Sequence, residues 1–212
     1  MKKLSFSACR LVSLSAIILS LVASIAHADI LDDLRARQSM IKSVSALFAQ
    51  EKKTRLLSRP IKTSGRFLYK QPDKIRWEYA GNANMQVIFN GKDLWLYYPA
   101  LKEADKLGGV SQYSSMLHFD VHSLSKDYTA AVKKERSLTL LTFLPKAKGP
   151  VNRIEMEISD DTSFPRMVKL LDQNNEPTTI FFRDVKINID IKDAVFNFVP
   201  ETDVVVRERS LP

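Results

Sequence analysis

Residues 65–99 read GRFLYKQPDKIRWEYAGNANMQVIFNGKDLWLYYP, and this stretch decides the fold class. Large apolar residues recur at every second position, as Ile75 and Trp77 do between charged neighbours. A period of two gives a strand one apolar face and one polar face. Asn90-Gly91 lies between two such runs, and Asn-Gly is a strong hairpin signal. The stretch therefore predicts an antiparallel meander of four strands with one broad apolar side.

Alternation of the same kind continues on both sides of this meander. Further strands are predicted at Val44 to Thr54, Ala130 to Leu144, Arg153 to Ser159, Met167 to Asp172, Thr178 to Val185, Phe196 to Phe198 and Val204 to Val206. The pattern contains no internal repeat, low-complexity segment or linker. We expect about ten to eleven antiparallel strands in one domain.

Helical spacing is confined to two short parts of the chain. Asp29 to about Lys42 predicts one helix, with acidic residues at the positive end of its dipole. Val110 to Phe119 shows helical spacing, and Ser123 or Ser125 is a candidate cap for a helix ending near Tyr128. The predicted fold is mainly β, an incomplete, unclosed antiparallel barrel whose apolar side is covered by short helices.

One face of the predicted sheet collects an excess of aromatic and aliphatic residues. An ordinary filled core explains each residue taken singly. The short helical segments, however, offer little apolar surface to fill so curved a sheet, so we expect a hydrophobic cavity. The predicted inner face consists of Phe48, Phe67, Tyr69, Ile75, Trp77, Val87, Phe89, Leu94, Leu96, Leu140, Ile154, Met156, Val168, Leu170, Ile180 and Phe182.

The N-terminus predicts export. A basic segment precedes the apolar run Leu11 to Ile25, and Ala26-His27-Ala28 then gives a small-x-small cleavage pattern. We expect residues 1–28 to be removed as a signal peptide and residues 29–212 to form a single periplasmic domain. Cys9 is the only cysteine and would leave with the signal, so no disulfide or thiol chemistry is expected.

Charge indicates no nucleic-acid partner. Removing the three basic residues of the signal lowers the formal net charge from +8 to +5. The basic residues are spread over polar strand faces among acidic ones, which is typical of a solvated surface. The alternative is that they steer the protein toward an anionic membrane or partner.

No motif of an enzyme is present. The run His118-Phe119-Asp120-Val121-His122 could suggest a metal site, yet no third ligand is evident, and two polar positions at a helix end explain it better. No Gly-x-Ser-x-Gly elbow and no glycine-rich phosphate loop occur. We predict no catalytic residue, no metal and no cofactor.

Several short runs, in this order, resemble the LolA family of periplasmic carriers of outer-membrane lipoproteins. They are Phe48-Ala49-Gln50, Gly65-Arg66-Phe67-Leu68-Tyr69-Lys70-Gln71-Pro72, Arg76-Trp77, Asn90-Gly91-Lys92-Asp93-Leu94-Trp95-Leu96-Tyr97-Tyr98-Pro99, Leu144-Pro145 and Phe196-Asn197-Phe198-Val199-Pro200. The resemblance extends over essentially the whole chain after residue 28.

The resemblance implies a carrier that holds acyl chains in a hydrophobic cavity under a helical lid. The cavity wall would be the inner-face set given above without Ile154, Val168 and Ile180. The lid would include Leu31, Leu34, Gln71, Tyr113, Met116, Leu117 and Phe119. The family has an arginine directly before the proline of its Gln71-Pro72 equivalent, and that arginine hydrogen-bonds the lid shut; here the residue is Gln71.

By the same resemblance, the partners would be lipoprotein acyl chains, an inner-membrane lipoprotein-releasing transporter and an outer-membrane acceptor, and the protein would be a monomer. The alternative function is a LolA-like binding or sensing module, or a carrier of another lipid such as a glycolipid or pigment. A structural protein with a filled core and no extractable lipid is the third possibility.

Overall fold

The architecture is described from a computed structural model, which places residues 30–81, 84–108 and 119–210. A helix spans residues 30–39, as predicted. The other elements are β1 (Ser43–Lys52), β2 (Ile61–Lys70), β3 (Lys74–Tyr79), β4 (Gln86–Asn90), β5 (Leu94–Tyr98), η2 (Pro99–Leu101), β6 (Glu103–Gly108), α3 (Val121–Asp127), β7 (Tyr128–Glu135), β8 (Leu138–Pro145), β9 (Val151–Ser159), β10 (Pro165–Asp172), β11 (Pro177–Ile187), η4 (Asp193–Phe196) and β12 (Val205–Ser210).

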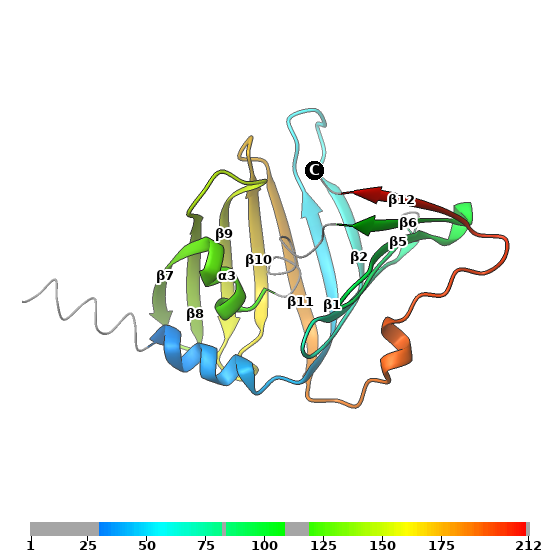
Figure 1. Cartoon of the computed structure of the whole chain (residues 1–212). Coiled ribbons are helices and arrows are strands. Elements are labelled where there is room, and N and C mark those ends of the chain that lie inside the picture. The colour runs from blue at the N-terminus through cyan, green and yellow to red at the C-terminus, as the bar shows by residue number, and fades with distance from the viewer. Residues whose placement is uncertain (1–29, 82–83, 109–118, 211–212) are drawn as a thin grey trace, which may run out of the picture.

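All twelve strands belong to one unclosed sheet, in the order β12-β6-β5-β4-β3-β2-β1-β11-β10-β9-β8-β7. The sheet curves strongly, and the helix at residues 30–39 and α3 lie against its concave side (Figure 1). β1 joins the two halves, because it pairs with β2 on one side and with β11 on the other. The mainly β, incomplete-barrel prediction is confirmed.

The β1–β2–β3 junction depends on a glycine. Gly65 of β2 lies opposite Phe48 of β1 and Tyr79 of β3. A Cβ at this position would lie 1.8 Å from the backbone oxygen of Glu78 and 2.9 Å from the Phe48 ring. Only a residue without a side chain allows this close approach.

Three local expectations need correction. The segment from Ala130 to Leu144 is not one strand but the β7–β8 hairpin, which turns at Arg136, where φ is +46°. Asp120, and not a serine, caps α3, since its side chain accepts a hydrogen bond from the Ser123 N–H. The helical segment expected from Val110 to Phe119 lies outside the described residues, except for Phe119 itself.

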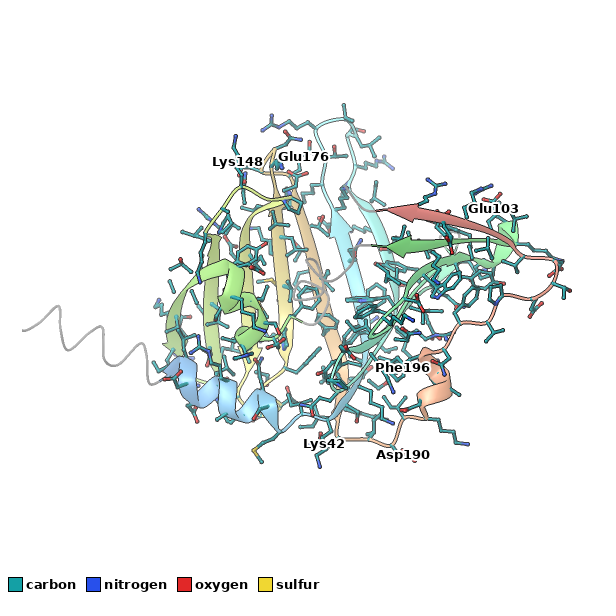
Figure 2. The ribbon with its side chains drawn as sticks, in the orientation of Figure 1. Lys42, Glu103, Lys148, Glu176, Asp190 and Phe196 are labelled. Atoms are coloured by element: carbon teal, nitrogen blue, oxygen red, sulfur yellow. The ribbon has the colours of Figure 1, made fainter. Side chains whose placement is uncertain are left out.

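A C-terminal segment, residues 188–204, crosses the convex side of β2, β3 and β4; we call it the C-terminal strap. It forms a second small core, in which Leu68, Ile191 and Phe196 are buried. Phe196, labelled in Figure 2, projects from η4 toward the sheet. The strand predicted at Phe196 to Phe198 was wrong, because η4 ends at Phe196 and no strand follows in the described residues before β12. Alternation of Phe196 and Phe198 around Asn197 suggested a strand, but the rest of the strap follows no strand or helix period.

Ion pairs hold the strap and the strand that follows it. Asp193 lies 2.6 Å from the Lys70 ammonium and 2.7 Å from that of Lys74, and hydrogen bonds from these two groups lower its pKa to about 2. Beyond the strap, β12 pairs with β6, and this is the parallel pair in an otherwise antiparallel sheet. Arg207 binds Glu103 through two hydrogen bonds of 2.6 and 2.7 Å. β12 is the strand predicted at Val204 to Val206. The total of twelve is one more than the highest count predicted, because β6 and the division into β7 and β8 were missed while the strand expected at Phe196 to Phe198 does not form.

Candidate functional site on the inner face of the sheet

An aromatic cluster lies at the centre of the concave face. Trp77 of β3 contacts Phe48 of β1 at 4.8 Å and Phe67 of β2 at 4.6 Å between ring centroids. Phe182 of β11 joins them, 5.6 Å from Phe67. The cluster forms because alternate residues of neighbouring strands point to one face, and β1 brings both halves of the sheet together. Such tilted and edge-to-face rings stabilise one another beyond their buried area.

The predicted cavity-wall positions meet around this cluster, with one exception. Phe48, Phe67, Ile75, Trp77, Phe89, Leu94, Met156 and Phe182 are buried in one apolar core, and Tyr69, Val87 and Leu170 pack against it partly buried. Leu96 lies on the same face, as its pairing with Val87 shows. Ile154, Val168 and Ile180 are buried there as well.

Leu140 is the exception, and its placement on the inner face was wrong. It pairs with Lys133 on β7 and with Glu157 on β9, so it lies on the convex side. The inward residues of β8 are Leu141 and Phe143, both fully buried. Leucines occupy both faces of this strand, and therefore period-two alternation could not decide its orientation.

Two helices cover this face; we call the helix at residues 30–39 and α3 the covering helices. Leu34, Val121 and Leu124 contribute apolar side chains with no exposed surface. Phe119, just before α3, places its ring 6.1 Å from Trp77 and 6.2 Å from Phe182. The covering layer is therefore continuous with the aromatic cluster beneath it.

Of the predicted lid residues, Leu34 and Phe119 are buried in this layer and Leu31 packs against it half-buried. Tyr113, Met116 and Leu117 lie outside the described residues. The sequence analysis missed Val121 and Leu124, which a helical period starting at Asp120 would have indicated.

Side-chain hydrogen bonds tie the covering helices to each other and to the sheet. Gln38 accepts a bond from the Val121 N–H at 3.0 Å and donates one to the Ser163 carbonyl at 3.1 Å. Arg35 donates to the Ser125 hydroxyl at 3.0 Å. Gln38 thus links both covering helices to the β9–β10 turn. No sequence signal marked Gln38, because a lone glutamine in a helix is commonplace.

Gln71, which follows β2, connects the sheet to the helix at residues 30–39 by a hydrogen bond. Its side-chain N–H donates to the Ser39 carbonyl at 3.0 Å, and its backbone N–H donates to the Lys42 carbonyl at 2.8 Å. Ser39 belongs to the last turn of the helix, where carbonyls have no partner within the helix. Gln71 therefore lies where a latch on this helix would lie, although it carries no charge.

A small cavity remains beneath the covering helices. It measures about 30 Å³ and is lined by Gln38, Ile41, Val44, Tyr69, Phe119, Asp120 and Phe164. That volume holds about one water molecule. Burial, and then the nearby carboxylates of Asp120 and Asp73, raise the pKa of Tyr69 to about 12, so this phenol stays neutral.

The described residues contain no cluster of potential metal ligands. Among them, no group of three or more His, Cys, Asp or Glu residues could hold a metal ion. His122 is exposed on α3, while His118 lies outside the described residues. None of the helices over residues 30–81, 84–108 and 119–210 is long and apolar enough to cross a membrane.

Comparison with known proteins identifies the family. Residues 39–199 match the model of the outer membrane lipoprotein carrier protein LolA, which is most of the chain. The chain belongs to the LolA family. LolA proteins are carriers and not enzymes, in agreement with the absence of a catalytic motif from the sequence.

Relatives of this LolA-family chain cover nearly its full length. An outer-membrane lipoprotein carrier protein of Francisella philomiragia is 28% identical over 204 residues, which is 92% of this chain and 97% of the relative. A protein of the same name from Pseudomonas aeruginosa is 26% identical over 196 residues, 88% of this chain and 94% of the relative.

Solved structures share the fold at low sequence identity. A conserved protein of Thermus thermophilus superposes with a TM-score of 0.57 at 13% identity, over 86% of this chain and 99% of that one. MucB superposes with a TM-score of 0.52 at 15% identity, over 85% of this chain and 66% of that one. These similarities support the fold alone.

Proposed function

We propose that this LolA-family protein carries the acyl chains of lipoproteins across the periplasm, from the inner to the outer membrane. The observation that carries the proposal is the covered aromatic face. It is a large apolar surface under two short helices, which a few side-chain hydrogen bonds tie to each other and to the sheet. Family membership supplies the cargo class. In this proposal residues 1–28 are a cleaved signal, and residues 29–212 act as one monomeric domain.

The physical need for such a carrier follows from the cost of exposing acyl chains. Transfer of one CH₂ group from water to an apolar environment contributes about 0.8 kcal/mol, so a palmitoyl chain carries roughly 12 kcal/mol. A lipoprotein cannot cross an aqueous space without an apolar surface that replaces the bilayer. An inner-membrane releasing transporter and an outer-membrane acceptor would then load and unload it.

Binding requires the cover to move. The cavity beneath the covering helices measures about 30 Å³, far too little for an acyl chain. Displacing Leu34, Leu124 and Phe119 would expose the aromatic cluster, and an acyl chain would take their place. The bound chain would recover the apolar contacts that opening removes, so closed and loaded states can be close in free energy.

The direct test is native mass spectrometry of the protein extracted gently from periplasm. We expect lipoprotein or another acylated molecule to be bound, and its mass identifies the cargo. A bound glycolipid or pigment would assign a different cargo. An empty protein that also fails to enhance the fluorescence of an apolar probe would contradict the carrier function.

Weakening the packing of the covering helices should increase the binding of an apolar probe. Leu34→Ala removes a fully buried side chain from the interface of the first covering helix and should cost about 2 kcal/mol of stability. Because the loss falls on the closed state, the fluorescence of a bound apolar probe should rise severalfold at equal protein concentration.

Leu68→Ala is the matched control. Leu68 is also buried, but it lies in the second core under the C-terminal strap. It should lower the melting temperature by a similar amount without raising probe uptake. Equal uptake in the two variants would show that general loosening, and not opening of the cover, admits the probe.

Gln71→Arg should have the opposite effect. A guanidinium at this position adds charge to the bond with the Ser39 carbonyl, and hydrogen bonds of charged groups contribute about 1.5–3 kcal/mol against about 1 for neutral ones. We expect a melting temperature a few degrees higher and weaker probe uptake. Gln71→Ala should reverse both changes. If neither variant alters uptake, Gln71 is not a latch.

A further inference from the structure

The connection between β1 and β2 forms an apolar tip at one end of the molecule; we call residues 53–60 the hairpin tip. The hairpin extends beyond the neighbouring strands at the top of Figure 1. Leu56 is 90% exposed and Leu57 is 51% exposed, and Ile61 at the base is 46% exposed. These three apolar side chains lie within six residues of one another at the most protruding part of the sheet.

The tip is held in place and not merely loose. The Lys53 N–H donates to the Pro177 carbonyl at 2.9 Å, and the Leu57 N–H donates to the Thr54 carbonyl at 3.2 Å. Arg55 donates from its backbone N–H to the Glu176 carboxylate at 2.9 Å and from its guanidinium to the Asn174 carbonyl at 3.2 Å. The β10–β11 turn thus supports the tip while both leucines face water.

Cations surround these leucines. Lys52, Lys53, Arg55, Arg59 and Lys62 lie within residues 52–62, which contain no acidic residue. Glu51 is the nearest acid along the strand, and its carboxylate lies 3.5 Å from Lys53 and 3.8 Å from Lys62, at exposed sites that water screens. Lys148 lies at the same end of the molecule, near Glu176 (Figure 2). Residues 51–62 thus carry five cations and one acid, and Glu176 of the β10–β11 turn is a second acid beside them.

We propose that the hairpin tip docks on the surface of an anionic phospholipid bilayer, with Leu56 and Leu57 entering the interface and the flanking cations binding headgroup phosphates. Apolar residues at a protruding tip with basic residues beside them match the two layers of such a surface, hydrocarbon below and anionic headgroups above. The charge complementarity favours a lipid surface over an apolar protein groove. The covering helix at residues 30–39 lies at the opposite end of the strands, so docking leaves it free to move (Figure 1).

The test is co-sedimentation with vesicles, using the purified protein without added cargo. We expect binding to vesicles of phosphatidylcholine with 30–40% phosphatidylglycerol, weaker binding to phosphatidylcholine alone, and loss of binding as salt increases. Leu56→Ser with Leu57→Ser should weaken binding at least about tenfold. Lys53→Gln with Arg59→Gln should weaken it by about fivefold for each charge removed, on anionic vesicles only.

Leu101→Ser is the matched control. Leu101 is 67% exposed in η2, which connects β5 to β6 and does not belong to the hairpin tip, so its replacement should leave binding unchanged. Unchanged melting temperatures would show that all variants fold. Absence of binding to either kind of vesicle, or an equal loss in Leu101→Ser, would overturn the proposal. If the native protein binds no vesicle, and a tip variant nevertheless loses its function in cells, the tip binds a protein partner and not a membrane.

Because no cargo is present, this experiment is independent of the proposed carriage of lipoproteins. If the protein binds vesicles but is extracted without lipid, the docking proposal stands and the carrier proposal fails. If it is extracted with lipid but binds no vesicle, the carrier proposal stands and the docking proposal fails.

Discussion

Gly65→Ala should destabilise the protein by about 4 kcal/mol or more, because a Cβ at this position would lie 1.8 Å from the Glu78 carbonyl oxygen. The obstructing atom is backbone, so it cannot turn away as a side chain could. Relief requires β2 and β3 to separate, beside the aromatic cluster formed by Phe48 and Trp77. In a domain of this size the melting temperature should fall by roughly 8–16 °C.

The matched control is Gly149→Ala. Gly149 lies between β8 and β9, and a Cβ there would meet no atom within 4 Å. Its replacement should change stability by no more than about 0.5 kcal/mol. Thermal unfolding followed by circular dichroism measures both variants. If the melting temperature of Gly65→Ala equals that of the native protein, β2 and β3 are not paired in this register.

Ile75→Glu is the second substitution with a large expected effect. Ile75 is 1% exposed and lies between Tyr69 and Phe89 on the inner face. A carboxylate there is desolvated without a partner, which costs several kcal/mol, a large share of the roughly 5–15 kcal/mol that stabilises a typical domain. We expect a melting temperature more than about 10 °C lower and no thermal stabilisation by acyl ligands that stabilise the native protein.

The penalty in Ile75→Glu should depend on pH, and Ile75→Gln isolates that dependence. Burial would raise the pKa of the new carboxyl above its unfolded value of about 4.3. The folded variant then binds more protons than the unfolded chain, so its stability falls as pH rises from the unfolded to the folded pKa. The difference in melting temperature between the Glu and Gln variants should therefore grow from about pH 4.5 to about pH 8.

Leu144→Glu serves as the control for charge alone, because Leu144 is 48% exposed on the opposite side of the sheet. It should leave both stability and ligand binding near native values. Ile75→Glu that melts at the native temperature yet binds no acyl ligand would mean that Ile75 lines an open cavity and not the packed core described above.

Sequence alone determined the strands of the meander and their inner face. Period-two alternation through Phe67, Ile75 and Trp77 assigns those side chains to one side whatever the rest of the chain does, because a strand has only two faces. The turn at Asn90-Gly91 fixed the β4–β5 register for an equally local reason. Where leucines occupy both faces, as around Leu140, the same rule gave the wrong side.

Only the tertiary structure decided how the two halves meet and what covers them. The bonds of Gln38 to Val121 and Ser163 join residues 83 and 125 positions apart, and no local pattern encodes such a pairing. The alternation of Phe196 and Phe198 predicted a strand, whereas the C-terminal strap buries Ile191 and Phe196 against strands more than 100 residues earlier, which no local pattern encodes. Alternation is a property of one strand, whereas cover, register across distant strands and the exposed hairpin tip are properties of the whole sheet.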